Sequence, residues 1–241
     1  MMNWLPPLVL AGAAALASIL GGVIVTSHKW ALKSLRYFMA VGAGFMLGAV
    51  FLEMIPESIQ RNGSAAALVL LGYLIVHMFE HTFASHLHFG EETHHDEVTD
   101  PVVGITALIG MLVHTFFDGV AIGAAFGISG TVGLLVFIAV FLHRVPDGFT
   151  IASILVTAGY SNTKAIVATA ALGLSTVVGV LVLSVVPGMN AYALPVSAGS
   201  LLYVAATDLM PEVNRDKGVT MAIMVFAGMG FFLLIQKIVG M

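Results

Sequence analysis

Two short segments, HTFFDG (114–119) and HRVPDG (143–148), each place a histidine and an aspartate four residues apart. Residues at this spacing share a helix face, so His114 would point with Asp118, and His143 with Asp147. Two imidazoles and two carboxylates form a nitrogen and oxygen ligand set that suits zinc and also accepts iron(II), manganese, cobalt or cadmium. The alternative is two hydrogen-bonded His–Asp pairs that only hold helices together, although one pair would be enough for that.

These pairs lie in a very apolar chain. Of its 241 residues, 59% are hydrophobic and 9% are charged, whereas a soluble domain carries about 25% charged residues. The composition predicts an integral membrane protein, in which an aspartate at the centre of a span costs roughly 2.5–3.5 kcal/mol. A divalent cation would offset that cost. The net charge of −4 gives no reason to expect nucleic acid, the lack of cysteine excludes thiolate ligands, and nothing resembles an ATP-binding loop or predicts an organic cofactor.

Eight segments are long and apolar enough to be the helices that position these pairs, since a helical span needs roughly 20 apolar residues. We predict an all-α membrane protein with a single domain, 1–241, and spans at about 5–26, 36–58, 64–86, 101–126, 131–157, 161–187, 191–211 and 217–240. Short connections favour a compact antiparallel bundle. Spans four and five carry the His–Asp pairs and are joined by a few residues near 127–130, so we expect them to be neighbours.

Basic residues predict the orientation of the bundle. With the N-terminus outside, six basic residues fall in inner loops and two at outer ends, which the positive-inside rule favours. The inner residues are Lys29, Lys33, Arg36, Lys164, Arg215 and Lys217, and the outer ones are Arg61 and Lys237. Eight spans then place both termini outside the plasma membrane. Arg144 lies within a span.

Spans two and seven resemble each other. VGAGFMLGAVFLEMIPE (41–57) aligns with VSAGSLLYVAATDLMPE (196–212) at a constant offset of 155 residues, which places Glu53 on Asp208 and Glu57 on Glu212. The two spans would run in opposite directions. We therefore expect a 3+2+3 inverted repeat: 1–86 and 158–241 around a central pair at 101–157, with a cytoplasmic loop at 87–100. Inverted repeats around a central site are typical of transporters. Chance similarity between two Gly/Ala-rich helices is the alternative.

HTFFDGVAIG resembles the fourth-helix signature of the ZIP (Zrt/Irt-like) divalent-metal transporters, and HRVPDG resembles their fifth-helix signature. The resemblance covers most of the chain, including the eight spans, both termini outside, the histidine-bearing loop and the 3+2+3 repeat. It implies that His114, Asp118, His143 and Asp147 form a transport site. It further implies that zinc, iron, manganese or cadmium moves into the cytoplasm through an elevator-like movement.

Two positions depart from the family pattern. Thr115 stands where the family often has asparagine, and Arg144 stands where it often has an acid that helps to hold a second metal. A cation at this position argues against a binuclear centre. We expect Arg144 to occupy the second-metal position and to pair with Asp147 or Asp118 when the site is empty. The alternative is that it faces lipid headgroups or another acid.

Acids and histidines elsewhere could collect or release the ion. Two acids lie toward the outer end of span two and two toward the inner end of span seven, and HMFEH (77–81) gives span three a polar face. These residues are Glu53, Glu57, Asp208, Glu212, His77, Glu80 and His81. The simpler interpretation is that they are solvated acids near the interface and a polar helix end.

The loop between spans three and four carries histidines that could bind metal weakly, namely His86, His88, His94 and His95. A solvated loop is the equal alternative. GxxxG spacings at Gly44–Gly48 and Gly123–Gly127 permit close helix packing and are weak evidence for a homodimer.

We interpret the chain as a transporter of divalent metal ions, zinc above the others, in the lipid bilayer, and not as an enzyme. An intramembrane zinc hydrolase is the second hypothesis, since it too would bury His and Asp and keep a position for water. The inverted repeat, the paired acids and the lack of an evident general base count against it. A metal-gated channel or sensor is a third hypothesis.

Overall fold

A computed structural model describes residues 3–27, 32–83, 101–186, 188–215 and 218–239. Within these residues the chain forms helices and no strand, so the predicted all-α class is confirmed. Eight helical spans are long and apolar enough to cross a membrane, and their ends lie within a few residues of the predicted ones. They are Leu5–Thr26, Leu35–Arg61, Ala65–Thr82, Gly104–Phe126, Gly130–Thr157, Asn162–Val185, Asn190–Asn214 and Val219–Val239.

Six of the spans are single helices and two are interrupted. The single helices are α1 (Leu5–Ser27), α4 (Ala65–Phe83), α5 (Pro101–Phe126), α6 (Gly130–Thr157), α7 (Asn162–Val185) and α10 (Val219–Val239). The second span consists of α2 (Leu32–Ala49), a π-helical turn η1 (Val50–Met54) and α3 (Ile55–Arg61). The seventh consists of α8 (Asn190–Tyr203), a π-helical turn η2 (Val204–Leu209) and α9 (Met210–Asn214).

Each interruption ends two residues before a proline. Pro56 and Pro211 have no amide hydrogen, and their rings clash with the carbonyl four residues earlier. The preceding turn therefore widens, so that Ile55 donates to the carbonyl of Val50, and Met210 to that of Ala205. Glu53 falls within η1 and Asp208 within η2. Turns of this kind are frequent at functional sites.

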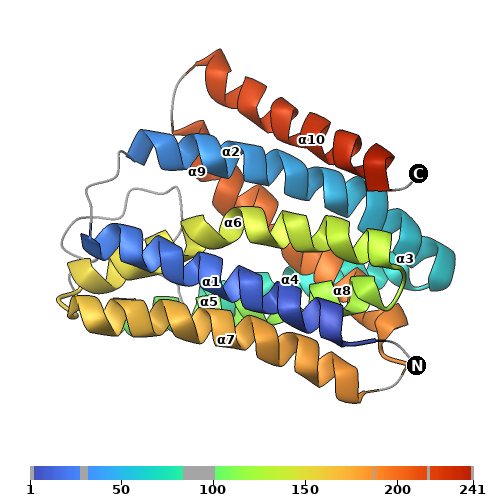
Figure 1. Cartoon of the computed structure of the whole chain (residues 1–241), viewed down its shortest axis with the longest axis horizontal. Coiled ribbons are helices and arrows are strands. Elements are labelled where there is room, and N and C mark those ends of the chain that lie inside the picture. The colour runs from blue at the N-terminus through green and yellow to red at the C-terminus, as the bar shows by residue number, and fades with distance from the viewer. Residues whose placement is uncertain (1–2, 28–31, 84–100, 187, 216–217, 240–241) are drawn as a thin grey trace.

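The helices form two groups. In the first group α1, α5, α6 and α7 pack on one another, whereas in the second group α2 packs on α10 and α4 packs on α8. Contacts of α5 with α8 and of α2 with α6 join the groups. In Figure 1, α1 and α7 lie along the bottom of the molecule and α2 and α10 along the top, with α6 between them.

Glycines allow helices of the first group to approach closely. A Cβ atom on Gly148 of α6 would strike the backbone carbonyl of Ser18 in α1, and a Cβ on Gly119 of α5 would strike that of Thr176 in α7. Both glycines directly follow the aspartates of the two His–Asp pairs. The pair on α6 is therefore carried by a helix that packs closely on α1, and the pair on α5 by a helix that packs closely on α7.

The second group has the same kind of contact at two equivalent places. A Cβ atom on Gly44 of α2 would strike the carbonyl of Val225 in α10, and one on Gly199 of α8 would strike that of Val69 in α4. Gly44 and Gly199 are separated by the same 155 residues that separate Glu53 from Asp208. The packing of α2 on α10 thus resembles the packing of α8 on α4.

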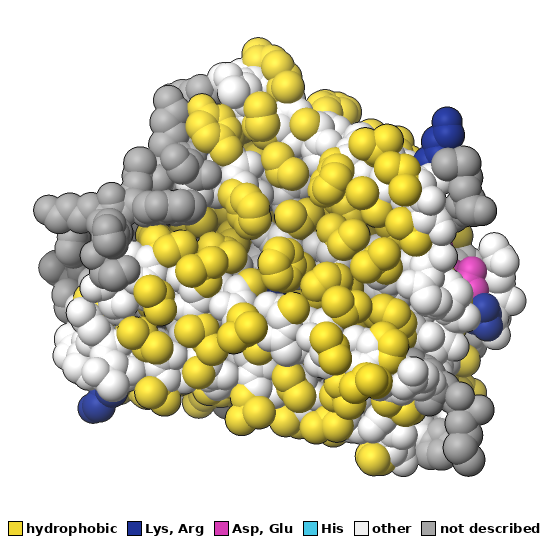
Figure 2. Space-filling model, viewed as in Figure 1, with side chains coloured by type: hydrophobic (Ala, Val, Ile, Leu, Met, Phe, Trp, Pro, Cys, Tyr) yellow, Lys and Arg dark blue, Asp and Glu magenta, His cyan; other side chains and the backbone are white. Residues whose placement is uncertain are grey.

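The surface is that of a protein surrounded by lipid. Hydrophobic side chains cover the middle of the face shown in Figure 2, and the charged side chains visible there lie at its left and right ends. Both chain ends lie at the right of Figure 1, as an even number of spans requires.

Candidate metal centre

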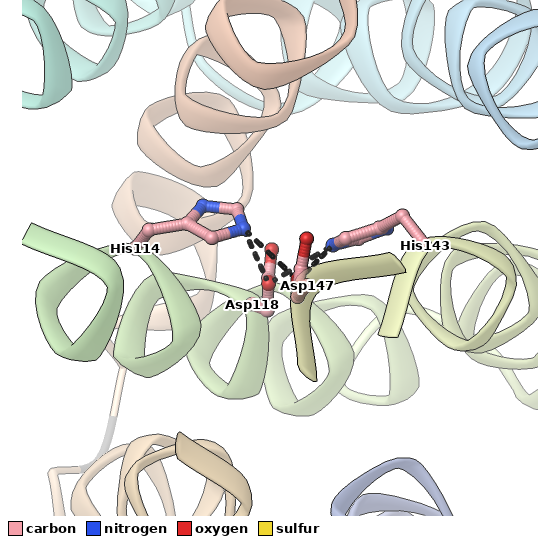
Figure 3. Close-up of side chains that lie close together, drawn as sticks. All are labelled: His114, Asp118, His143 and Asp147. Carbon is pink, nitrogen blue, oxygen red and sulfur yellow. Dashed lines mark hydrogen bonds and ion pairs between the residues drawn. The ribbon is translucent and has the colours of Figure 1, made fainter. Parts of the chain in front are cut away.

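The two His–Asp pairs meet in the interior. His114 and Asp118 of α5 and His143 and Asp147 of α6 each offer one ligand atom, and these atoms all lie within 4.8 Å of one another. Figure 3 shows the two imidazoles approaching the two carboxylates from opposite sides. All four side chains are buried. Helical spacing places each pair on one face of its helix, and the short connection makes α5 and α6 neighbours.

The distances between the four atoms suit one metal ion. Nε2 of His114 lies 3.2 Å from Oδ2 of Asp118 and 3.8 Å from Oδ2 of Asp147. Nε2 of His143 lies 3.3 Å and 3.7 Å from the same two oxygens. A tetrahedral zinc ion with ligand distances near 2.1 Å has edges of about 3.4 Å between its ligand atoms. A single ion could therefore bind here with small shifts of the side chains.

The imidazole of His143 is held in one orientation. Its Nδ1 atom lies 3.0 Å from the carbonyl oxygen of Ala139, one turn earlier in α6. When Nδ1 carries the proton and donates to that carbonyl, Nε2 presents its lone pair to the carboxylates, as a metal ligand must. The bond also fixes the ring plane.

Several polar atoms of the site are buried without a hydrogen-bond partner. Nδ1 of His114 and Oδ1 of Asp118 are two of them, and Nε2 of His114 lies close to the carboxylate oxygens without a well-directed hydrogen bond. Buried polar atoms are normally satisfied, because leaving one unpaired costs about 1–3 kcal/mol. A cation could bind lone pairs that face the centre of the cluster and accept no hydrogen bond. Nε2 of His114, which is close to both carboxylates without a well-directed hydrogen bond, is therefore an atom that a divalent ion could bind.

Arg144 belongs to the same cluster. Its side chain is fully buried, and its guanidinium donates through Nη2 to Oδ2 of Asp118 and through Nη1 to Oδ2 of Asp147, the latter at 3.3 Å. It does not face the headgroups, which was the alternative drawn from the sequence. The guanidinium shares the oxygens that approach the histidines, so it offsets one of the two carboxylate charges.

Thr115 lies beside the centre but points back along its own helix. The side chain is buried, and its hydroxyl donates to the carbonyl of Leu112 at 3.1 Å. Ser175 of α7 donates to the same carbonyl at 2.8 Å. The contacts of Thr115 are therefore with the backbone of α5.

A small cavity adjoins the centre. Its volume is about 40 Å³, and His114 and Asp147 form part of its wall together with Glu80 of α4 and Asp208 of η2. The cavity is large enough for about one water molecule or ion. Two thioethers, Met39 and Met111, also line it. Sequence reasoning missed them, because a methionine on an apolar helix looks the same whether it faces a cavity or lipid.

The other predicted path residues lie apart from the four ligands. Glu53 accepts a hydrogen bond of 2.6 Å from the amide of Gln236 in α10. Glu57 pairs with Arg61 at 2.6 Å, one turn later in α3.

At the opposite end of the molecule, Glu212 lies between Arg36, at 3.2 Å, and Arg215, at 3.1 Å. The rings of His77 and His81 are in contact, with centroids 4.0 Å apart and planes tilted by 41°. His77 also contacts Tyr203. Among the residues that the structure describes, none of these groups forms a second cluster of three possible metal ligands. His86, His88, His94 and His95 lie outside the described residues.

A family profile and several known proteins that resemble this chain all carry the same description. A sequence profile described as ZIP zinc transporter matches residues 85–236. Zinc transporter ZIP9 of Micropogonias undulatus is 32% identical over 167 residues, which cover 64% of this chain and 53% of that protein. Zinc transporter ZIP9-B of Xenopus laevis is 26% identical over 244 residues, covering 80% of each. Zinc transporter ZIP13 of Pongo abelii is 28% identical over 213 residues, covering 78% of this chain and 60% of that protein. These names describe transporters rather than enzymes.

Proposed function

The chain belongs to the ZIP zinc transporter family, and we propose that it moves a divalent metal ion, zinc before other metals, across the membrane toward the cytoplasm. The observation that carries the proposal is the convergence of four nitrogen and oxygen ligand atoms between α5 and α6. The relatives are named zinc transporters, and the ligand set suits zinc. Because it has two carboxylates and no thiolate, it would also accept iron(II) or manganese.

Arg144 makes the site suitable for a cargo that must leave again. When the ion departs, two buried carboxylates remain, and an uncompensated buried charge is strongly destabilising. The guanidinium already contacts both carboxylates, so the empty site carries one excess negative charge rather than two. The difference in free energy between the loaded and empty site is thereby reduced, which favours exchange over permanent retention.

We propose that the centre holds one metal ion and that Arg144 occupies the place of a second. Oδ1 of Asp118 has no hydrogen-bond partner. A rotation of this carboxylate could give one oxygen to the ion and the other to the guanidinium. The ion and Arg144 can thus bind Asp118 together, with no need for Arg144 to leave the interior.

An elevator-like movement is the transport step that we propose. The ligands all belong to the first helix group, whereas Glu80 and Asp208, which face them across the cavity, belong to the second. The matching glycine contacts and the matching π turns support an inverted 3+2+3 repeat, in which the two groups can exchange inward-facing and outward-facing arrangements. Sliding of the first group along the second would expose the site to one side at a time.

The distribution of charge indicates which end of the molecule faces the cytoplasm. Arg36, Lys164 and Arg215 lie where α2 and α7 begin and α9 ends, at the left of Figure 1. The positive-inside rule assigns this end to the cytoplasm, with both chain termini outside the plasma membrane. Asp208 lies in the part of the seventh span that leads to this end, so the cavity it lines would be the route of release.

The test is uptake of radioactive zinc into liposomes that contain the purified chain. Asp118→Ala and Asp147→Ala should each reduce uptake at least tenfold, because each removes a charged ligand. Glu57→Ala is the matched control, since Glu57 is an acid paired with Arg61 at the end of α3, and it should transport like wild type. If both aspartate variants also transport like wild type, the four-ligand site is not the transport site. Mild chelation should remove the metal from wild type, whereas a hydrolase would retain it.

A further inference from the structure

A second cavity lies away from the metal centre, where α7 begins. Its volume is about 280 Å³, and its walls are Ile105 and Leu108 of α5, Leu155 of α6, and Val167 and Ala171 of α7. Val167 is 62% exposed and Ile105 is 43% exposed, and both lie within spans. The cavity is therefore an apolar groove open to the surface of the spans.

The groove lies between the end of α5 that holds Ile105 and Leu108 and the beginning of α7. Nearer the centre they are held together where Gly119 meets Thr176 and where Ser175 donates to the carbonyl of Leu112 at 2.8 Å. The groove lies beyond these contacts, where residues of both helices line it. A molecule seated in it would contact the helix that carries His114 and Asp118.

The mouth of the groove is positively charged. Lys164 and Tyr160 both line it, and the ammonium of Lys164 lies 5.4 Å from the centre of the Tyr160 ring. Among the described lining residues, Lys164 alone is charged. It lies in the first turn of α7, where the positive end of the helix dipole adds to the potential.

We propose that this groove binds an anionic phospholipid, with an acyl chain between α5 and α7 and the phosphate at Lys164. The apolar walls match an acyl chain, and the single cation at the mouth matches a negative headgroup. A zwitterionic lipid would fill the groove but gain less from Lys164, since one lysine at a membrane surface favours anionic lipid about fivefold. This site goes beyond metal transport and does not depend on it.

The test uses the purified full chain in detergent, with dioleoyl phosphatidylglycerol or dioleoyl phosphatidylcholine added in increasing amounts. Lipid retention in native mass spectrometry and the midpoint of thermal unfolding are the two readouts. We expect phosphatidylglycerol to bind wild type about fivefold more tightly than phosphatidylcholine, and Lys164→Gln to abolish this preference. Lys237→Gln is the matched control, because Lys237 is an exposed lysine at the end of α10. Ala171→Phe, which fills the groove, should weaken binding of both lipids.

Equal binding of the two lipids by wild type would overturn the proposal, as would an unchanged preference in Lys164→Gln. Inorganic phosphate is included at matched concentration, and a Lys164-dependent shift with phosphate alone would indicate an ion site rather than a lipid site. Unfolding without added lipid shows whether each variant is folded.

Discussion

The guanidinium of Arg144 in α6 donates to the carboxylate of Asp118 in α5, and both side chains are fully buried. The contact crosses the seam between the two helices that carry the candidate ligands. It supplies a fixed positive charge where the family pattern often has an acid. The charge of the empty centre, the number of ions that it can hold and the stability of the empty protein should therefore all depend on Arg144.

We predict that wild type binds one divalent ion at the centre and that Arg144→Asp binds two. The substitution removes the cation and adds a carboxylate beside Asp118 and Asp147, which creates ligands for a second ion. Zinc should be counted by elemental analysis after equilibrium dialysis. The count should be made with His86, His88, His94 and His95 replaced by alanine, so that loop binding does not contribute. Two ions at the centre of the wild-type chain would contradict the assignment.

We also predict that Arg144→Met lowers the stability of the metal-free protein by about 3–5 kcal/mol, because it leaves two buried carboxylates without a countercharge. Zinc should restore much of the loss, since a ligand that binds only the folded state stabilises it. Thermal unfolding with and without zinc measures both effects. Lys237→Met is the control, and its midpoint should stay close to that of wild type. A metal-free Arg144→Met as stable as wild type would show that Arg144 does not neutralise the site.

The core of the site could be predicted from sequence because it depends on local rules. His114 with Asp118, and His143 with Asp147, share a face through helical spacing, and the short connection at 127–129 makes α5 and α6 neighbours. The interruptions at Pro56 and Pro211 follow from the missing amide, although the sequence alone did not indicate how the helix would adjust.

Contacts between distant segments could not be predicted. Glu57 and Arg61 are one helical turn apart, so their pairing is local. Glu212 and Arg36 also pair but are separated by 176 residues of sequence. From the sequence alone, the long side chain of Arg144 in α6 could point either toward the aspartates or toward the lipid headgroups. The contact with Asp118, 26 residues earlier in the chain, shows which of the two it faces. The cavity beside His114 also depends on the meeting of five separate spans.

Deletion of residues 90–98 should leave zinc transport measurable. The four candidate ligands all lie between positions 114 and 147, and their contacts are with α5 and α6. Removing part of a connection between spans leaves those contacts unchanged. Uptake into liposomes, normalised to folded protein, is the measurement. Complete loss of transport by a folded deletion variant would show that the segment takes part in the transport step.

Gly148→Ala should destabilise the protein or arrest transport. Its Cβ would strike the backbone carbonyl of Ser18, so α6 and α1 would have to separate and Asp147 would shift with them. Gly12→Ala is the matched control, because a Cβ there meets no atom within 4 Å, and alanine favours a helix by about 1 kcal/mol over glycine. Thermal unfolding and zinc uptake should therefore separate the two variants. Equal behaviour would mean that the contact between α1 and α6 is looser than the structure indicates.

Glu80→Gln and Asp208→Asn should slow transport without abolishing metal binding at the centre. Both carboxylates line the cavity that adjoins His114 and Asp147, and each attracts a cation leaving the four-ligand site. Neither contributes to the four ligands, so zinc affinity in equilibrium dialysis should change little while uptake falls several-fold. Glu57→Gln is the matched control, since Glu57 is paired with Arg61 away from this cavity. A loss of zinc binding in Glu80→Gln would instead place Glu80 among the ligands of the bound ion, and unchanged uptake in both variants would exclude this cavity as the release route.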